Sequence, residues 1–184
     1  MNPDASSAMV FNIGLMEDVD EAAITCFVAK IPLHDLLFLD RDLREPKVLA
    51  AWRDGIGSGF IHSLVAVADG NVIATTAVIR DPLSWSAHVA EMRLLVLPEW
   101  RGKGVGRKLL EASIERAVAD GAVKLTARMT PDQQGAITLF EETGFRGEAL
   151  LRDHVRGPDG QAHDLAILSL DVVASEARRR ALEG

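Results

Sequence analysis

The stretch from Val89 to Gly121 constrains the fold of this chain more than any other. It reads V-A-E-M-R-L-L-V-L-P-E-W-R-G-K-G-V-G-R-K-L-L-E-A-S-I-E-R-A-V-A-D-G. An apolar run that ends at Pro98 is followed by a glycine-rich basic turn, residues 101–106, and then by a helix with one apolar side. A strand that leads through such a turn into a helix exposes several backbone N–H groups beside the positive end of the helix dipole. The stretch therefore predicts a site for a phosphate-bearing ligand.

Two common phosphate-binding fingerprints do not fit this turn. The Rossmann fingerprint needs G-x-G-x-x-G, whereas residues 102–106 read G-K-G-V-G. A Walker A loop needs a glycine, four residues and then G-K-[S/T], and the chain has no such sequence. A nucleotide-binding domain is therefore only a weak alternative. The cations around the turn suit a pyrophosphate with a further phosphate nearby; they are Arg101, Lys103, Arg107 and Lys108.

The composition limits the partners and the location that we expect. A net charge of −7 disfavours a nucleic acid or an anionic membrane, because both repel an acidic protein. No apolar run is long enough to span a bilayer, and the first residues lack the basic and apolar regions of a signal peptide. The single cysteine, Cys26, excludes an internal disulfide and favours a reducing compartment. We therefore expect a cytoplasmic protein.

The 184 residues suit one domain. We expect an N-terminal tail over residues 1–8, a single domain over 9–173 and a solvated C-terminal tail over 174–184. Within the domain, hairpins imply antiparallel strand pairs, and strand–helix–strand units imply parallel pairs. The fold class is therefore α/β (α+β) with a mixed sheet.

Periodicity and turn residues predict the individual elements. Strands are expected over residues 9–15, 60–68, 72–79, 87–97, 123–129, 145–155 and 163–172. The Asp69-Gly70 pair predicts a hairpin turn. Helices are expected over residues 17–30, over 46–52 with glycines at 55, 57 and 59 as its end, and after the central turn. A further helix should begin at Asp132 as its N-cap and end at Gly144.

Two motifs in this pattern resemble those of a known superfamily. The R-G-K-G-V-G of residues 101–106 follows a strand ending in V-x-P and resembles the acyl-CoA-binding motif [R/Q]-x-x-G-x-[G/A] of the GNAT superfamily of N-acetyltransferases. Residues 133–145, Q-Q-G-A-I-T-L-F-E-E-T-G-F, resemble its second motif, N-x-x-A-x-x-L-Y-x-x-x-G-F. The motifs occur in the right order, one strand apart, and the resemblance covers residues 60–172. It implies a mixed, mostly antiparallel central sheet of six to seven strands flanked by about four helices.

The resemblance also implies that the central turn binds acetyl-CoA. The backbone N–H groups of residues 101–106 would hold the pyrophosphate, and the backbone of residues 95–97 would lie along the pantetheine arm. Gln133 replaces the usual asparagine of the second motif and would still hydrogen-bond this arm. The cofactor-binding residues expected in this way are Leu95, Val96, Leu97, Arg101, Gly102, Lys103, Gly104, Val105, Gly106, Arg107, Gln133 and Phe140. Independently of the family, glycine at 104 and 106 permits close approach to phosphate and unusual backbone angles.

Acyl transfer to an amine also needs a base and a donor for the developing oxyanion. By the same resemblance, Glu91 is the candidate general base, and the backbone N–H of Val96 is the candidate oxyanion donor. Glu91 and Arg93 lie two residues apart on one strand and share a face if no bulge intervenes. An ion pair without a role in the chemistry is therefore the alternative for Glu91.

The family's frequent general acid is absent. That acid is the tyrosine of the second motif, whose place is taken by Phe140, and the chain contains no tyrosine. A thiol with a pKa of about 8.5 leaves acceptably as a thiolate near neutrality, so the loss is a modest handicap. It keeps a catalytically silent acyl-CoA-binding or regulatory module as the competing interpretation. The histidines and the one cysteine show no metal-ligand spacing, so no metal is expected.

We therefore predict an acyl-CoA-dependent N-acetyltransferase that transfers an acetyl group directly to a primary amine of a small molecule or peptide. Its partners would be acetyl-CoA, an amine acceptor and, through the last hairpin, a second copy in a homodimer. Residues 31–45 are expected to carry acceptor selectivity. Their acidic side chains could attract a cationic amine, although a charge run is also typical of a solvated face.

Overall fold

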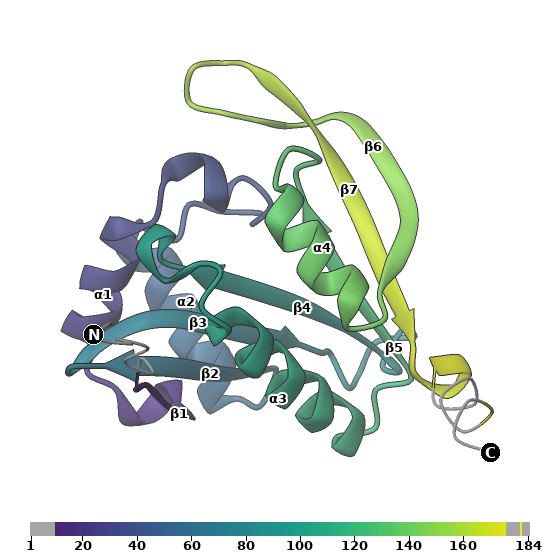
Figure 1. Cartoon of the computed structure of the whole chain (residues 1–184), viewed down its shortest axis with the longest axis horizontal. Helices are drawn as coiled ribbons and strands as arrows, with labels where there is room; N and C mark the ends of the chain where they lie inside the picture. Colours follow the sequence, from purple (N-terminus) through teal and green to yellow (C-terminus); the bar gives the residue numbers. More distant parts are fainter. Residues whose placement is uncertain (1–9, 176–180, 182–184) are drawn as a thin grey trace, which may run out of the picture.

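A computed structural model of the protein describes residues 10–175 and residue 181. The predicted tail over residues 1–8 and most of the predicted tail over 174–184 lie outside the described residues. Seven strands form one sheet in the order β1-β2-β3-β4-β5-β7-β6 (Figure 1). The strands are β1 (Asn12–Leu15), β2 (Ile61–Ala68), β3 (Asn71–Ile79), β4 (Val89–Val96), β5 (Lys124–Met129), β6 (Arg146–Arg156) and β7 (Ala162–Asp171). Neighbours are antiparallel except β4 and β5, which are parallel, so the predicted mixed sheet is confirmed.

Two layers of helices cover this sheet. The α-helices are α1 (Glu21–Lys30), α2 (Pro46–Gly57), α3 (Val105–Ala119) and α4 (Gln134–Glu142). Helices α3 and α4 lie on the face turned to the viewer in Figure 1, and α1 and α2 lie on the other face. Each layer buries its own apolar core, with Phe27 at the centre of one and Leu110 in the other. Within the described residues, no helix is long and apolar enough to cross a membrane.

The local sequence signals explain most element boundaries. The hairpin between β2 and β3 turns at Asp69 and Gly70, whose φ angles are +49° and +75°, as a tight turn with two left-handed residues requires. Gly144, with a φ of +104°, follows the last turn of α4 as predicted.

Several predicted boundaries were wrong. The first helix, expected from residue 17, begins at Glu21, and residues 16–18 form a separate short 3-10 helix. Helix α2 does not stop after Trp52 but continues through Gly55 to Gly57. A Cβ at Gly55 would lie 2.6 Å from Ile61 Cδ1, so this glycine lets the helix pack closely on β2. Helix α4 begins at Gln134, so its N-cap is Gln133 rather than Asp132. The Asp132 carboxylate caps no helical N–H group and accepts a hydrogen bond from His34 Nε2.

The one parallel pair separates along its length. Pairing between β4 and β5 runs from Val89 and Lys124 to Met92 and Ala127 and then stops. Strand β4 continues to Val96 and stays paired with β3 on its other edge. The backbone of residues 94–96 therefore has one open edge.

Candidate functional site

A groove of about 810 Å³ lies where β4 and β5 separate. It brings together most of the predicted cofactor residues, namely Leu95, Val96, Arg101, Gly102, Gly104, Gly106, Arg107, Gln133 and Phe140. Four other predicted site residues do not line it. The side chains of Leu97 and Val105 are buried. Lys103 lies over the Trp100 ring, and Glu91 lies farther back on β4.

The backbone of the central turn presents a row of free donors. Among the described residues, no backbone acceptor is hydrogen-bonded to the N–H groups from Gly102 to Arg107, and the first helical bond runs from the Lys108 N–H to the Gly104 carbonyl. Gly102 and Gly104 have φ angles of +70° and +79°, a left-handed conformation that L-residues rarely adopt. Consecutive N–H groups at a helix N-terminus form an anion-binding concavity.

Gly106 has a different role from the two left-handed glycines. It has an ordinary helical conformation, and a Cβ there would lie 3.2 Å from Leu139 Cδ2 and 3.4 Å from Val96 Cγ2. Its missing side chain therefore lets the start of α3 approach both α4 and β4. This close packing fixes the turn against the open edge of β4.

The backbone N–H and carbonyl groups of Val96 are on the groove side of β4. The Leu97 N–H donates to the Ile73 carbonyl on β3 at 3.0 Å, and successive N–H groups of a strand alternate in direction. The Val96 N–H is therefore directed away from β3, toward the groove. Its carbonyl accepts a hydrogen bond from Arg101 Nε at 3.2 Å. Within residues 95–97, only Val96 has its backbone on the open side.

The cations of the groove already have acidic partners. Arg101 donates to Asp35 Oδ2 at 2.6 Å, and Arg107 pairs with Glu142. Asp35 lies on the turn η2 (Leu33–Leu36), whose His34 also reaches Asp132 at 2.6 Å. This turn is thus tied to both walls of the groove. The sequence offered no signal for these contacts beyond charge.

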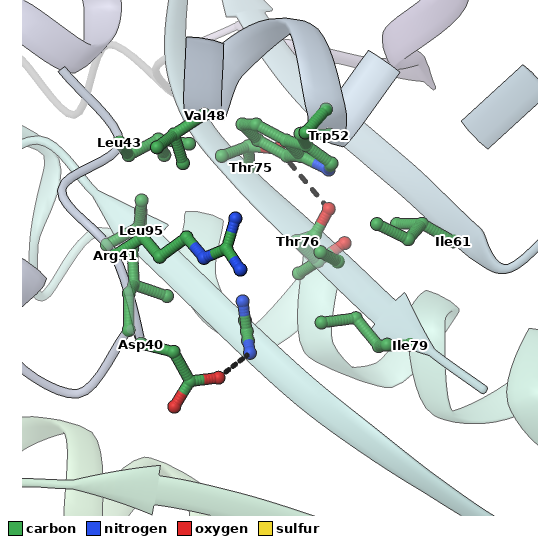
Figure 2. Close-up of a pocket in the computed structure, with 14 residues that line it drawn as sticks. Asp40, Arg41, Leu43, Val48, Trp52, Ile61, Thr75, Thr76, Ile79 and Leu95 are labelled. Carbon is green, nitrogen blue, oxygen red and sulfur yellow. Dashed lines mark hydrogen bonds and ion pairs between the residues drawn. The ribbon is translucent and has the colours of Figure 1, made fainter. Parts of the chain in front are cut away.

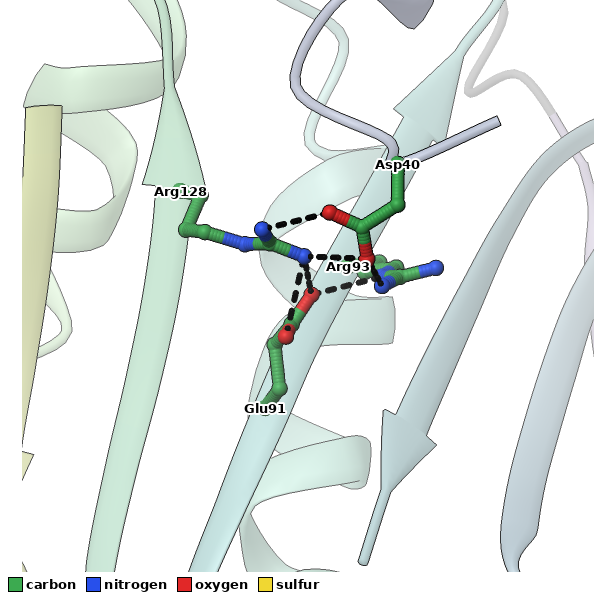
Figure 3. A network of polar contacts seen from close by, with 4 residues as sticks. All are labelled: Asp40, Glu91, Arg93 and Arg128. Carbon is green, nitrogen blue, oxygen red and sulfur yellow. Dashed lines mark hydrogen bonds and ion pairs between the residues drawn. The ribbon is translucent and has the colours of Figure 1, made fainter. Parts of the chain in front are cut away.

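Behind the groove, four charged side chains form an ion-pair network (Figure 3). Arg93 Nε donates to Glu91 Oε1 at 2.6 Å, and the Arg128 Nη2 atom lies 2.9 and 3.1 Å from the two Glu91 oxygens. Asp40 accepts from Arg128 at 2.7 and 2.9 Å and from Arg93 at 3.2 Å. Hydrogen bonding to Arg128 holds the pKa of the Asp40 carboxyl below its usual range, and the same bonds raise the pKa of Arg128. Both guanidinium groups are mostly buried, at 23% and 20% side-chain exposure.

The network contains the pairing that the sequence analysis left open for Glu91. Glu91 does contact Arg93, and it also contacts Arg128, which the sequence analysis missed. Only the alternation of β5 pointed to Arg128, because it places residues 124, 126 and 128 on one face and buries the residues between them. Both carboxylate oxygens of Glu91 therefore accept charge-assisted hydrogen bonds from arginine.

A second cavity, of about 210 Å³, lies on the α2 side of the sheet (Figure 2). Its walls are mostly apolar and include Leu43, Val48, Trp52, Ile61, Ile79 and Leu95. Asp40, Arg41 and Arg93 form its polar rim. Leu95 lines both this cavity and the groove, so the two spaces share a wall.

A third cavity, of about 470 Å³, lies between residues 33–42 and the β6–β7 hairpin, with Arg128 on its wall. Arg128 also lines the groove, so the ion-pair network stands between all three spaces. Among residues 10–175, no group of three or more His, Cys, Asp or Glu side chains is placed to hold a metal ion.

Comparison with known proteins matches this geometry to one family. The model of the acetyltransferase (GNAT) family matches residues 19–145. A solved structure of yncA, a putative acetyltransferase from Salmonella typhimurium with its cofactor acetyl-CoA, superimposes with a TM-score of 0.75 at 25% identity, over 89% of this chain and 94% of that one.

Similar curated proteins match over shorter stretches of the chain. N-alpha-acetyltransferase 30 of Schizosaccharomyces pombe is 25% identical over 123 residues, which cover 66% of this chain and 82% of that protein. N-acetyltransferase 8 of Rattus norvegicus is 30% identical over 99 residues, or 52% of this chain. The match spans 43% of the rat protein, less than half of its length.

Proposed function

The chain belongs to the acetyltransferase (GNAT) family, and on that premise we propose that it transfers an acetyl group from acetyl-CoA to a primary amine of a small molecule or peptide. The observation that carries this proposal is the row of free N–H groups from Gly102 to Arg107, set at the end of a groove along the open edge of β4. Such a row suits a pyrophosphate, and the open edge suits an extended amide-bearing arm.

The cofactor would be held mainly by backbone groups. We assign the pyrophosphate to residues 101–107 and the pantetheine arm to the edge of β4 at residues 95–97, chiefly Val96. Gln133, whose Oε1 accepts from the Thr130 N–H at 3.1 Å, has its amide nitrogen left to donate to the arm. Phe140 packs edge-on against Phe145, with ring centroids 5.0 Å apart, and offers the groove an apolar wall. Arg101 and Arg107 would exchange their carboxylate partners for phosphate oxygens.

In the reaction, acetyl-CoA supplies an activated acetyl thioester, and the chain supplies orientation and proton transfer. The amine nitrogen forms a bond to the acetyl carbon while the carbon–sulfur bond breaks. Glu91 receives the amine proton through water, at Oε2, which contacts only Arg128 at 3.1 Å. The Val96 N–H donates to the oxygen that gains charge during attack. No tyrosine can protonate the leaving sulfur, so it departs as a thiolate.

The competing candidate is a silent acyl-CoA-binding module, which the missing tyrosine favours. Calorimetric titration with acetyl-CoA, CoA and ATP tests the groove first, and we expect the two CoA compounds to bind and ATP not to. Release of free thiol from acetyl-CoA with a panel of primary amines then tests turnover. Binding of ATP but not of CoA would overturn the cofactor assignment. Binding of acetyl-CoA without thiol release from any amine would favour the silent module.

The remaining proposals concern the setting of the enzyme. We propose that residues 9–173 form the single acyltransferase domain, and that it acts in the cytoplasm without a nucleic-acid or membrane partner. The acidic net charge of −7 and the exposed free Cys26 support this setting. We also propose a homodimer through the final hairpin, where β6 forms the edge of the sheet and Leu150 is half-exposed.

A further inference from the structure

The cavity on the α2 side has apolar walls whose polar atoms are already satisfied. Trp52 Nε1 donates to Ser63 Oγ at 2.9 Å, and Thr75 Oγ1 donates to the Leu64 carbonyl at 2.9 Å. Thr76 pairs with Ser113 at 2.6 Å. The walls therefore offer a ligand only apolar surface. An apolar cavity of about 150 Å³ can hold benzene, so this one, at about 210 Å³, accommodates a branched or aromatic side chain.

Arg41 brings an uncompensated positive charge to this cavity. Figure 2 shows its side chain extending from the loop into the cavity. Among the described residues, no carboxylate lies within salt-bridge distance of its guanidinium. By contrast, the network of Arg93, Arg128, Asp40 and Glu91 contains two charges of each sign.

The acidic side chains of residues 31–45 do not change this balance. Asp35 pairs with Arg101, Asp42 pairs with Arg44, and Asp40 belongs to the network. The fourth acid, Glu45, lines none of the three cavities. The expectation that these acids attract a cationic amine therefore finds no free carboxylate on the walls of this cavity, where the charge without a partner is that of Arg41.

The position of the cavity connects it to the proposed reaction. Leu95 forms part of both its wall and the wall of the groove, next to the Val96 N–H proposed as the oxyanion donor. Arg93, on the rim of the cavity, contacts Glu91, the proposed base. The polar groups of a molecule bound in the cavity would therefore lie beside the reacting end of the cofactor.

We propose that the acceptor is a free α-amino acid with an apolar side chain, such as leucine, methionine or phenylalanine. Its side chain fills the cavity beneath Trp52, its carboxylate binds the Arg41 guanidinium, and its amine faces Leu95 and Glu91. Arginine suits this task because its planar donors can bind a carboxylate at two points. This assignment rests on the proposed acetyl transfer and specifies the acceptor of the same site.

The same features disfavour two other amine classes. A polyamine has no anionic group for Arg41 and would meet an uncompensated like charge. A peptide N-terminus has its first carboxyl group converted to an amide, so it would leave Arg41 without a charged partner. Only a compact molecule with an amine, a carboxylate and an apolar group side by side uses all three surfaces.

The test measures binding apart from turnover. We titrate three compounds calorimetrically into the protein: L-leucine, L-leucinamide and glycine. The protein is first saturated with CoA, because CoA carries no acetyl group and no turnover can occur. We expect leucine to bind more tightly than both others. Arg41→Gln should weaken leucine binding about 10- to 100-fold, as expected for lost charge-assisted hydrogen bonds, and leave leucinamide unchanged. Arg44→Gln is the matched control, because Arg44 lies on the same loop, pairs with Asp42 and lines none of the three cavities.

A second variant tests the cavity. Val48→Phe narrows it and should weaken leucine binding about 10-fold while glycine is unaffected. Leucinamide binding as tightly as leucine, or Arg41→Gln weakening both alike, would overturn the proposal. Acetylation of other amines without any leucine binding would also overturn it and leave the proposed function standing. Arg41-dependent leucine binding without thiol release from acetyl-CoA would instead refute the proposed function.

Discussion

The two spaces that meet at β4 are built on different principles. The groove along its open edge is lined by the continuous stretch over residues 95–107, by residues 132–142 opposite it and by the segment over residues 31–38. The cavity over its face is formed by side chains from α2, β2, β3, β4 and the loop over residues 39–43. Substitution of a single side chain should therefore change the ligand specificity of the cavity more than that of the groove.

The ion-pair network separates the two spaces and belongs fully to neither. Its members come from the α1–α2 loop, β4 and β5, and Arg128 lines the groove while Asp40 and Arg93 line the cavity. A change in the network should therefore affect turnover more than cofactor binding. A change in the turn should do the opposite.

The largest effect is expected for Glu91→Gln. Loss of a general base should lower the turnover number about 100-fold or more, while CoA affinity, measured by calorimetry, should change by less than about twofold. The acidic limb of the plot of turnover number against pH should disappear, because the group that must be deprotonated is gone. Glu115→Gln, an exposed change on α3, serves as the control.

An unchanged acidic limb in the Glu91→Gln variant would remove Glu91 from the proton chemistry. Its contacts with Arg93 and Arg128 would then mark it as a positioning residue. A large loss of CoA affinity in the same variant would contradict the separation of the two spaces.

The next effect is expected for Gly104→Val. A β-branched side chain at a φ of +79° costs about 2 kcal/mol. This corresponds to about 30-fold weaker CoA binding if the turn relaxes in the free variant and must return to this conformation to bind CoA. Gly70→Val is the matched control, because Gly70 has a φ of +75° in the hairpin between β2 and β3, away from the groove. It should lower the melting temperature similarly and leave CoA affinity intact. Equal losses of CoA affinity in both variants would show that backbone strain alone, and not contact between the central turn and CoA, is responsible.

The smallest effect is expected for Asp40→Asn. The pKa of Asp40 is lowered in the folded protein by Arg128, so its ionised form stabilises the fold above its unfolded pKa of about 3.9, and this contribution is lost as the pH falls through the folded value. Because the side chain is 61% exposed, the variant should lose only about 0.5 kcal/mol of unfolding free energy at pH 7.

Urea denaturation at several pH values measures this loss, which should vanish once the pH lies below the lowered pKa of Asp40 in the folded protein. Asp42→Asn removes a carboxylate that pairs with the more exposed Arg44 and should cost less. A deficit in the Asp40→Asn variant that persists at low pH would assign the effect to packing rather than to charge.

The sequence by itself determined the backbone features of this protein. Three features follow from residues that are close in the chain, because turn geometry and element type depend on local dihedral preferences. They are the Asp69-Gly70 turn, the order of strands and helices, and the glycine-rich turn over residues 101–106. The same local signals were less reliable where packing opposed them. Gly55 lies inside α2 and brings it close to Ile61.

Only the tertiary structure decided which side chains meet. Asp40 and Arg128 are 88 residues apart in sequence, and no local pattern connects them. Glu91 and Arg93 could be paired from strand alternation, but their shared contacts with these two residues depend on how β5 and the α1–α2 loop are placed beside β4. The unpaired charge of Arg41 follows from the same placement, since it appears only once Asp35, Asp40 and Asp42 have been assigned their partners. Local dihedral preferences act within a few residues, whereas ion pairs and cavity walls depend on the packing of the whole sheet.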